Sequence, residues 1–200
     1  MKAWALVLYA AVFAAPAAAA DRIQEIKDDI AAKGGTADLY VELGNACYDV
    51  ADYKPAADAF RMAVGYAPSD GYIHYRLAEA LFANGDLREA IVSYRTALAC
   101  EPPPVRANYQ IGQAYLALGD NAAAAAAFTA YVETAPADFN GLWFLGQAYE
   151  RQGRYAEALE QYELIRDYAT GPFAAAGEIG TFGTVEDLKK HIKKVAKKVK

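Results

Sequence analysis

Residues 71–104 read GYIHYRLAEALFANGDLREAIVSYRTALACEPPP, and the pattern in this stretch occurs four times in the chain. The four copies are each 34 residues long and follow one another without insertions. They begin at Ala37, Gly71, Val105 and Phe139. Each copy has an apolar residue at its seventh position and a small residue at its eighth. Small residues let two helices approach closely, so the pattern predicts stacked pairs of antiparallel helices.

The second half of each copy carries an alanine at its twentieth position and an aromatic residue four positions later. The alanines are Ala56, Ala90, Ala124 and Ala158, and the aromatic residues are Phe60, Tyr94, Phe128 and Tyr162. We expect the aromatic side chain to fill the seam between one helix pair and the next. A proline ends each of the first three copies: Pro68, Pro102 and Pro136. Thr170 takes that place in the fourth copy, which predicts a longer second helix in that copy.

The period, the small residue and the aromatic residue together resemble the tetratricopeptide repeat family, whose units are helix-turn-helix pairs of this length. The resemblance covers residues 37–170. It implies an all-α fold, a right-handed α-solenoid with flanking N- and C-terminal helices. The four units would occupy residues 37–70, 71–104, 105–138 and 139–172. At the twenty-seventh position Tyr131 and Ile165 replace the alanines of the first two units, which predicts wider or differently twisted packing there.

The first 20 residues have the pattern of a bacterial secretory signal peptide. Lys2 precedes an apolar run from Ala3 to Phe13, and small residues lie before Asp21. The run is shorter than the roughly 20 residues of a membrane-spanning helix. We therefore expect cleavage near Asp21 and a periplasmic or secreted protein. Residues 21–36 would form an N-terminal helix with Asp21 as its N-cap and Thr36 capping the next helix.

The C-terminal residues differ in charge from the rest of the chain. Glycines predict a linker at residues 173–183, and Thr184 with Asp187 predicts the start of a basic amphipathic helix at 184–200. Seven lysines and two acids give this segment a net charge of +5, which leaves −10 for the rest of a chain whose total is −5. Its apolar stripe consists of Leu188, Ile192, Val195 and Val199. Two roles remain open: a cap on the fourth helix pair, or contact with an anionic membrane or an acidic partner. We expect no nucleic-acid partner.

The sequence contains no set of residues typical of catalysis, and we expect a non-enzymatic protein without a metal or cofactor. It lacks the HExxH and CxxC motifs and a phosphate-binding glycine loop. His74 is expected to pack in a helix seam, and His191 lies among the lysines of the tail. Cys47 and Cys100 are predicted to lie too far apart to form a disulfide.

The family resemblance also implies a binding surface. We call the N-terminal helix of each repeat its first helix. In that family the inner, concave face is lined by the first helices, at the second, fifth, ninth, twelfth and thirteenth positions of each repeat. Aromatic residues recur at the fifth and twelfth positions here, and mostly amide residues at the ninth. The candidate groove residues are Asn45, Tyr48, Tyr75, Glu79, Phe82, Arg106, Tyr109, Gln113, Trp143 and Gln147. Aromatic rings and amides suit an extended peptide, but the same rings also suit simple packing between neighbouring first helices.

Some members of the family hold a partner's C-terminal carboxylate with a clamp of basic and asparagine residues. Asn45 and Arg106 match two of the five clamp positions, whereas Val41, Arg76 and Gln110 depart from it. We therefore expect no carboxylate clamp. The sequence predicts a non-catalytic interaction scaffold of the cell envelope that binds a partner peptide. The alternative is an envelope-associated spacer or self-assembly protein that docks on an anionic membrane or polymer through its lysine-rich helix.

Overall fold

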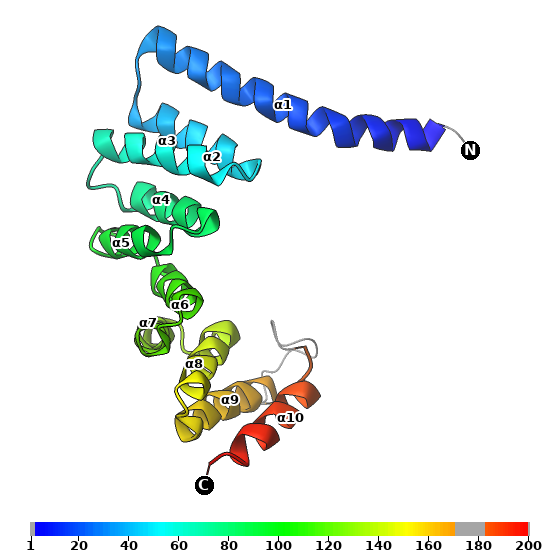
Figure 1. Cartoon of the computed structure of the whole chain (residues 1–200), viewed down its shortest axis with the longest axis vertical. Helices are drawn as coiled ribbons and strands as arrows, with labels where there is room; N and C mark the ends of the chain where they lie inside the picture. Colours follow the sequence, from blue (N-terminus) through cyan, green and yellow to red (C-terminus); the bar gives the residue numbers. More distant parts are fainter. Residues whose placement is uncertain (1–2, 171–182, 200) are drawn as a thin grey trace. The chain divides into compact units, whose positions relative to one another are not determined.

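The chain is built from helices throughout the part that the structure describes. The structure, a computed structural model, describes residues 3–170 and 183–199, with side chains from residue 18 onward. Ten helices follow one another in these residues (Figure 1). The predicted linker at 173–183 lies outside the described residues except for Gly183. The helices form two compact units, residues 1–104 and 105–200, which we describe separately.

The first unit contains two of the predicted helix pairs. α2 (Ala37–Asp49) pairs with α3 (Tyr53–Tyr66), α4 (Gly71–Asn84) pairs with α5 (Leu87–Leu98), and α3 packs against α4. The second unit repeats this order. α6 (Ala107–Leu118) pairs with α7 (Asn121–Thr134), α8 (Phe139–Arg151) pairs with α9 (Tyr155–Thr170), and α7 packs against α8. The predicted all-α solenoid of helix-turn-helix units is confirmed.

The small residues of the repeat lie where the two helices of a pair approach each other. A Cβ atom built on Gly112 would be 2.7 Å from the ring of Phe128, and one on Gly146 would be 2.5 Å from the ring of Tyr162. Each aromatic residue therefore packs within its own helix pair, not only in the seam to the next pair as predicted. Phe128 also reaches that seam, because its ring stacks on Phe144 of α8.

The enlarged twenty-seventh position of the third repeat is accommodated locally. A Cβ on Gly141, in the first turn of α8, would be 2.8 Å from the ring of Tyr131. Because Gly141 has no side chain, the larger ring of Tyr131 fits beside it. In the fourth repeat Ile165 is fully buried against the C-terminal helix.

Helix starts depend on the residue that precedes each repeat. The side chains of Thr36, Asp70 and Asp138 accept hydrogen bonds from backbone N–H groups in the first turns of α2, α4 and α8. Pro104 stands at the corresponding place before the third repeat and offers no such acceptor. Accordingly α6 begins at Ala107, two residues later than predicted, without a side-chain cap.

The turns inside the helix pairs use the left-handed backbone conformation. Gly85, Gly119 and Gly153 have φ angles of 92°, 79° and 75°. The first repeat has Ala51 at this place, and Ala51 adopts the same conformation with φ of 61°. Because a Cβ disfavours this region, the first turn is strained.

The N-terminal helix is longer than expected. α1 spans Ala3–Lys33, so Asp21 lies inside a continuous helix and is not its N-cap. The alanines that precede Asp21 are the strongest helix formers and extend the helix through that position. Ile26 is buried, and Arg22 pairs with Glu42, which joins α1 to α2. Within the described residues, no helix combines the length and apolar character needed to cross a membrane.

The C-terminal helix α10 (Val185–Ala196) covers the last repeat. It begins with the predicted capping box, in which Thr184 and Asp187 bond each other's backbone N–H groups. Leu188, Ile192 and Val195 are buried in one cluster with residues of α8 and α9. The interpretation of this helix as a cap is therefore confirmed, although Val199 is exposed and does not join the buried stripe. α9 extends through Thr170, so it is longer than α3, α5 and α7, as predicted.

Candidate protein-binding surface

The aromatic residues at the fifth position of the first helices are half-buried, each against a ring of its own repeat. Tyr75 lies 5.4 Å from Tyr94 between ring centroids, and Trp143 lies 4.9 Å from Tyr162. Tyr109 is packed in the same way, 5.7 Å from Phe128. These contacts pair the two helices of one repeat. Tyr109 also lies 5.9 Å from Phe144 of α8, so the packing between neighbouring first helices that the sequence left open as an alternative occurs at this ring. Only part of each ring reaches the surface.

In the first unit, candidate residues from two consecutive repeats meet around Arg76. The Arg76 guanidinium donates to Asn45 Oδ1 from Nε at 3.1 Å and from Nη2 at 2.9 Å, and it pairs with Glu79 at 2.6 Å. The same guanidinium lies 5.0 Å from the centre of the Tyr48 ring. The Arg76 and Glu79 side chains are only 19% and 20% exposed. The result is a fixed polar and aromatic surface shared by α2 and α4.

This cluster engages the asparagine that matches the carboxylate clamp. Asn45 keeps its clamp position, but both of its hydrogen bonds come from Arg76, which replaces the next asparagine of the clamp. Phe82, the remaining candidate of the first unit, is half-buried on α4. The sequence placed Asn45, Tyr48 and Glu79 in one surface, and the structure brings them together. It did not predict that Arg76 would connect them.

In the second unit the candidate residues fall into two places. Arg106 lies over the ring of Tyr109, 5.4 Å from its centre. Burial raises the pKa of the Tyr109 hydroxyl, and its hydrogen bond with Gln113 opposes that rise. Trp143 lies instead against α10, with its ring 5.0 Å from that of His191. The predicted row is therefore interrupted at its last repeat, because α10 covers one side of Trp143.

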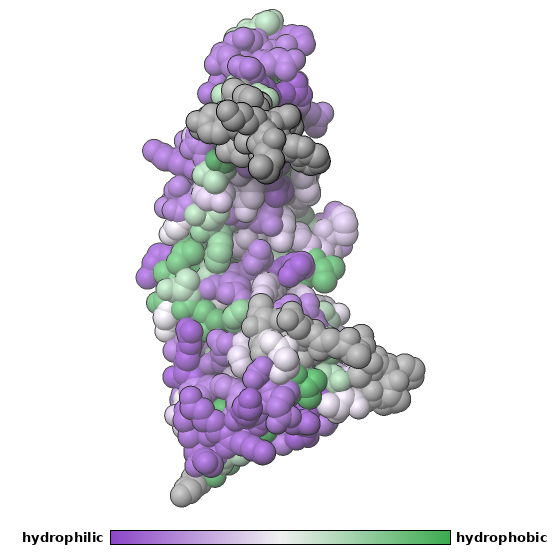
Figure 2. All heavy atoms as spheres, turned by 90° about the vertical axis from the view of Figure 1, so that its right-hand side faces the viewer, coloured by the Kyte–Doolittle hydropathy of each residue, from purple (hydrophilic) through white to green (hydrophobic). Residues whose placement is uncertain are grey.

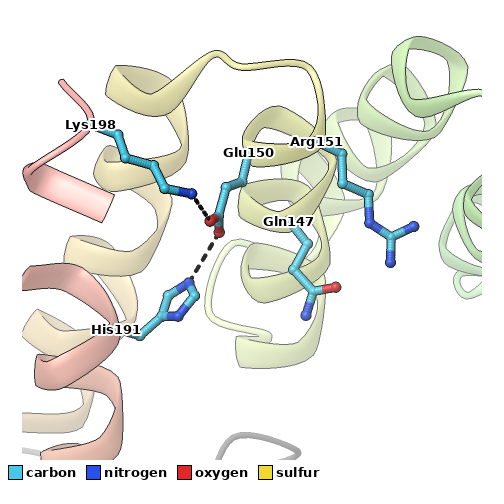
Figure 3. Close-up of a pocket in the computed structure, with 5 residues that line it drawn as sticks. All are labelled: Gln147, Glu150, Arg151, His191 and Lys198. Carbon is cyan, nitrogen blue, oxygen red and sulfur yellow. Dashed lines mark hydrogen bonds and ion pairs between the residues drawn. The ribbon is translucent and has the colours of Figure 1, made fainter. Parts of the chain in front are cut away.

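Where the C-terminal segment contacts α8 there is a polar site, of which the groove prediction included only Gln147 (Figure 3). Glu150 Oε1 accepts from Lys198 Nζ at 3.2 Å, and Oε2 lies 3.2 Å from His191 Nε2. Burial favours the neutral form of Glu150, but the bond from Lys198 and the charges of His191 and Lys198 outweigh it and lower the pKa of Glu150. A cavity of about 290 Å³ lies here, lined also by Gln147 and Arg151.

A signal for this site was present in the sequence. Glu150 is the only charged residue at the twelfth position of the four repeats, where Tyr48, Phe82 and Leu116 are the other members. A charge in an otherwise aromatic and apolar row requires a partner. The partners lie 41 and 48 residues away, in a segment whose register against α8 no spacing rule specifies.

The remaining polar candidates lie apart from these surfaces. His74 Nε2 is 2.9 Å from the backbone oxygen of Pro68 and therefore fixes the loop before α4, instead of packing in a helix seam. Cys47 is buried in α2, and Cys100 follows α5; both are free thiols. Within residues 3–170 and 183–199, no three histidine, cysteine or acidic side chains gather in an arrangement that would hold a metal ion.

Two family models match this chain over the repeats. A model described as tetratricopeptide repeat matches residues 109–175, and a model described as TPR repeat matches residues 78–119. The first segment covers most of α6 and all of α7, α8 and α9, and the second runs from the middle of α4 through α5 and α6. The chain is a tetratricopeptide-repeat protein. No curated protein matches its sequence.

Solved structures of other tetratricopeptide-repeat proteins have a similar fold. A structure of MamA is 20% identical, with a TM-score of 0.71, and the match covers 85% of this chain and 97% of that one. MamA from Desulfovibrio magneticus is 20% identical with a TM-score of 0.63, covering 82% and 90%. YrrB is 20% identical with a TM-score of 0.66, covering 80% and 82%. At these identities the likeness establishes the fold of the tetratricopeptide-repeat protein described here.

Proposed function

We propose that this protein is a non-catalytic interaction scaffold of the cell envelope and that it binds an extended segment of a partner protein along its first helices. The Arg76 cluster is the observation that carries this proposal. It joins Asn45, Tyr48 and Glu79 from two consecutive repeats into one half-buried surface. Such a surface keeps its shape before a partner arrives, which lowers the entropy cost of binding.

In the second unit, side chains on the first helices of the repeats also suit a peptide backbone. Gln113 and Gln147 stand at the ninth position of their repeats and are partly exposed. Each amide offers both donors and an acceptor to a backbone, while the outer parts of Tyr109 and Trp143 supply apolar contact area. YrrB, which has a similar fold, is described as a TPR protein with an unusual peptide-binding site. That description supports a peptide as the class of partner.

The envelope location rests on the N-terminal sequence. Lys2, the apolar run at residues 3–13 and the small residues before Asp21 form a signal-peptide pattern. Mass spectrometry of the protein isolated from its native cells tests this part. A mature N-terminus near Asp21 in the envelope fraction supports the location, and an intact N-terminus in the cytoplasmic fraction contradicts it.

Site-specific photo-crosslinking tests the binding surface. A photoreactive amino acid is placed at Gln113 or Gln147 in one set of variants. Gln161 of α9, also partly exposed but on a second helix, serves as the matched control. After irradiation in native cells, we expect the first two positions to link to the same partner, at one continuous segment of its sequence. We expect no such product at Gln161.

The outcome is decided by where the crosslinks form. Equal crosslinking at all three positions would show contact without a preferred face, and crosslinking at Gln161 alone would place the partner on the second helices. Either result contradicts the proposal. Alanine variants of Tyr75, Tyr109 and Trp143 are unsuitable here, because these rings pack within their repeats and their loss would weaken the fold itself.

A further inference from the structure

The C-terminal helix has two faces with separate contacts. Its apolar face is used inside the protein, because Leu188 and Val195 are fully buried and Ile192 is 8% exposed. Its other face carries exposed lysines at residues 189, 190, 193 and 194, and two more exposed lysines, 197 and 198, follow its last residue. The i, i+4 spacing places the four helical lysines in two adjacent rows. The surface in the lower part of Figure 2, where α10 lies, is mostly hydrophilic.

Among the residues that the structure describes, half of these lysines have no acidic partner. Lys189 and Lys190 lie 3.7 Å and 3.5 Å from acids three residues earlier in α10, and Lys198 pairs with Glu150. Lys193, Lys194 and Lys197 pair with no acid among the residues that the structure describes. Their positive charges therefore remain available to an external anion. We call the three residues the lysine surface.

We propose that the lysine surface docks this protein on a bilayer that contains anionic phospholipids. The charge is complementary, since lysines near an anionic membrane are each attracted to its surface potential. All seven basic residues of the tail are lysine and none is arginine. Lysine is a compact, strongly hydrated charge that suits a fluid layer of headgroups, and it is depleted at protein interfaces, where arginine is enriched. The residues thus favour a membrane over a protein partner.

The structure also specifies the manner of docking. The buried apolar stripe leaves α10 without a hydrophobic face to insert between lipid chains, so the attraction is electrostatic. The rest of the chain carries a net charge of −10 and is repelled by the same membrane. The protein would therefore lie with α10 toward the bilayer. This inference does not depend on the peptide-binding surface of the first helices.

Co-sedimentation with vesicles tests the proposal on the mature chain. One set of vesicles contains phosphatidylcholine alone, and the other also contains phosphatidylglycerol. The test variant is Lys193→Gln, Lys194→Gln, Lys197→Gln, which keeps the buried stripe intact. The control variant is Lys33→Gln, Lys54→Gln, Arg88→Gln, which removes three exposed positive charges from the first unit. A third variant replaces the lysine surface by arginines and keeps its charge.

We expect binding only to the vesicles with phosphatidylglycerol. Three lysines near the membrane surface contribute roughly a hundredfold in affinity, so the glutamine variant should bind about a hundredfold more weakly. The control and arginine variants should bind like the wild type. Binding should also be lost between about 0.1 and 1 M salt, as the screening length falls from about 10 Å to 3 Å.

Three results would overturn the proposal. They are equal binding to both kinds of vesicle, no binding of the wild type to either, and wild-type affinity in the glutamine variant. Thermal melting of each variant accompanies the assay, because an unchanged midpoint shows that α10 still caps the fourth repeat. If the glutamine variant melts early, each single lysine variant is assayed instead, with about a fivefold loss expected from each.

Discussion

Gly112 lies so close to Phe128 that a Cβ on the glycine would be 2.7 Å from two atoms of the ring. Phe128 is fully buried and has no room to move aside. We expect Gly112→Leu to lower the free energy of unfolding by about 1–3 kcal/mol or more through overpacking. Urea unfolding measures the change. Gly65→Ala is the control, since nothing lies within 4 Å of that position, and it should leave stability unchanged or slightly higher.

Tyr131 donates a hydrogen bond to the residue that caps the first helix of the fourth repeat. Its hydroxyl donates to Asp138 Oδ2 at 2.6 Å, and Oδ1 of the same carboxylate caps α8. Tyr131→Phe should therefore lower the free energy of unfolding by about 1–2 kcal/mol, as expected for a hydrogen bond to a charged group that is partly buried. An unchanged unfolding curve would show that the bond contributes nothing.

The contact of Tyr131 with Asp138 also predicts that the stability of the fold falls at alkaline pH. Burial, and then the bond to Asp138, raise the pKa of Tyr131 from 10.0 to about 12. A raised pKa stabilises the fold below the unfolded value, and this contribution is lost as the pH rises from 10.0 through about 12. The stability difference between wild type and Tyr131→Phe should shrink over that range. A difference that stays constant to pH 12 would contradict the assignment.

Ala51 offers a stabilising substitution. It is the only residue other than glycine with a positive φ among those that the structure describes, at 61°. Ala51→Gly removes the clash of the Cβ, but glycine gains freedom in the unfolded chain, so we expect a net gain of about 0.5 kcal/mol. Gly85→Ala should have the opposite sign and cost about 1 kcal/mol. Thermal melts of both variants check the pair, and a loss of stability in Ala51→Gly would refute the strain argument.

Because α10 caps the fourth repeat, removing one of its buried side chains should strongly lower the stability of the second unit. Leu188 is fully buried against the fourth repeat, so Leu188→Ala should lower the free energy of unfolding of the second unit by about 2–5 kcal/mol. Its exposed neighbour gives the control, because Lys189→Ala should change stability by less than about 0.5 kcal/mol. Binding of a dye specific for exposed apolar surface should rise only in the first variant. Equal behaviour of the two variants would mean that α10 does not cap the array.

Glu150 makes the attachment of α10 sensitive to acid. Its pKa is lowered from 4.5, so its contribution to stability is complete above that value and is lost as the pH falls through the lowered pKa. At neutral pH, Glu150→Gln should cost about 0.5–1 kcal/mol, because the side chain is near the surface and its ion pair is partly screened. The melting midpoints of wild type and variant should converge below pH 4.5. Midpoints that stay equally far apart in acid would contradict this role.

The repeat pattern was sufficient to predict the helix pairs, because each pair is stabilised by contacts within 34 residues. The seam between Gly146 and Tyr162 and the left-handed turn at Gly153 follow from local spacing alone. The late start of α6 was also readable in principle, since Pro104 cannot act as the cap that Asp70 provides.

The surface was predicted less well, because its side chains bond across repeats and to the C-terminal helix. The sequence placed Asn45 and Tyr48 on one surface, but the position of Arg76 between them depends on how α4 packs beside α2. Trp143 shows the same limit. Its contact with His191 follows from the docking of α10, and no periodicity connects the two residues.

The fit between Tyr131 and Gly141 also makes the two positions depend on each other. The bulky ring in the third repeat fits because the fourth repeat lacks a side chain opposite it. A larger residue at position 141 would clash with the ring, so the two positions can be changed only together. For protein engineers, the third and fourth repeats are consequently one module. They can be moved to another array as a pair, whereas the third repeat alone would need a neighbour with its own glycine at this place.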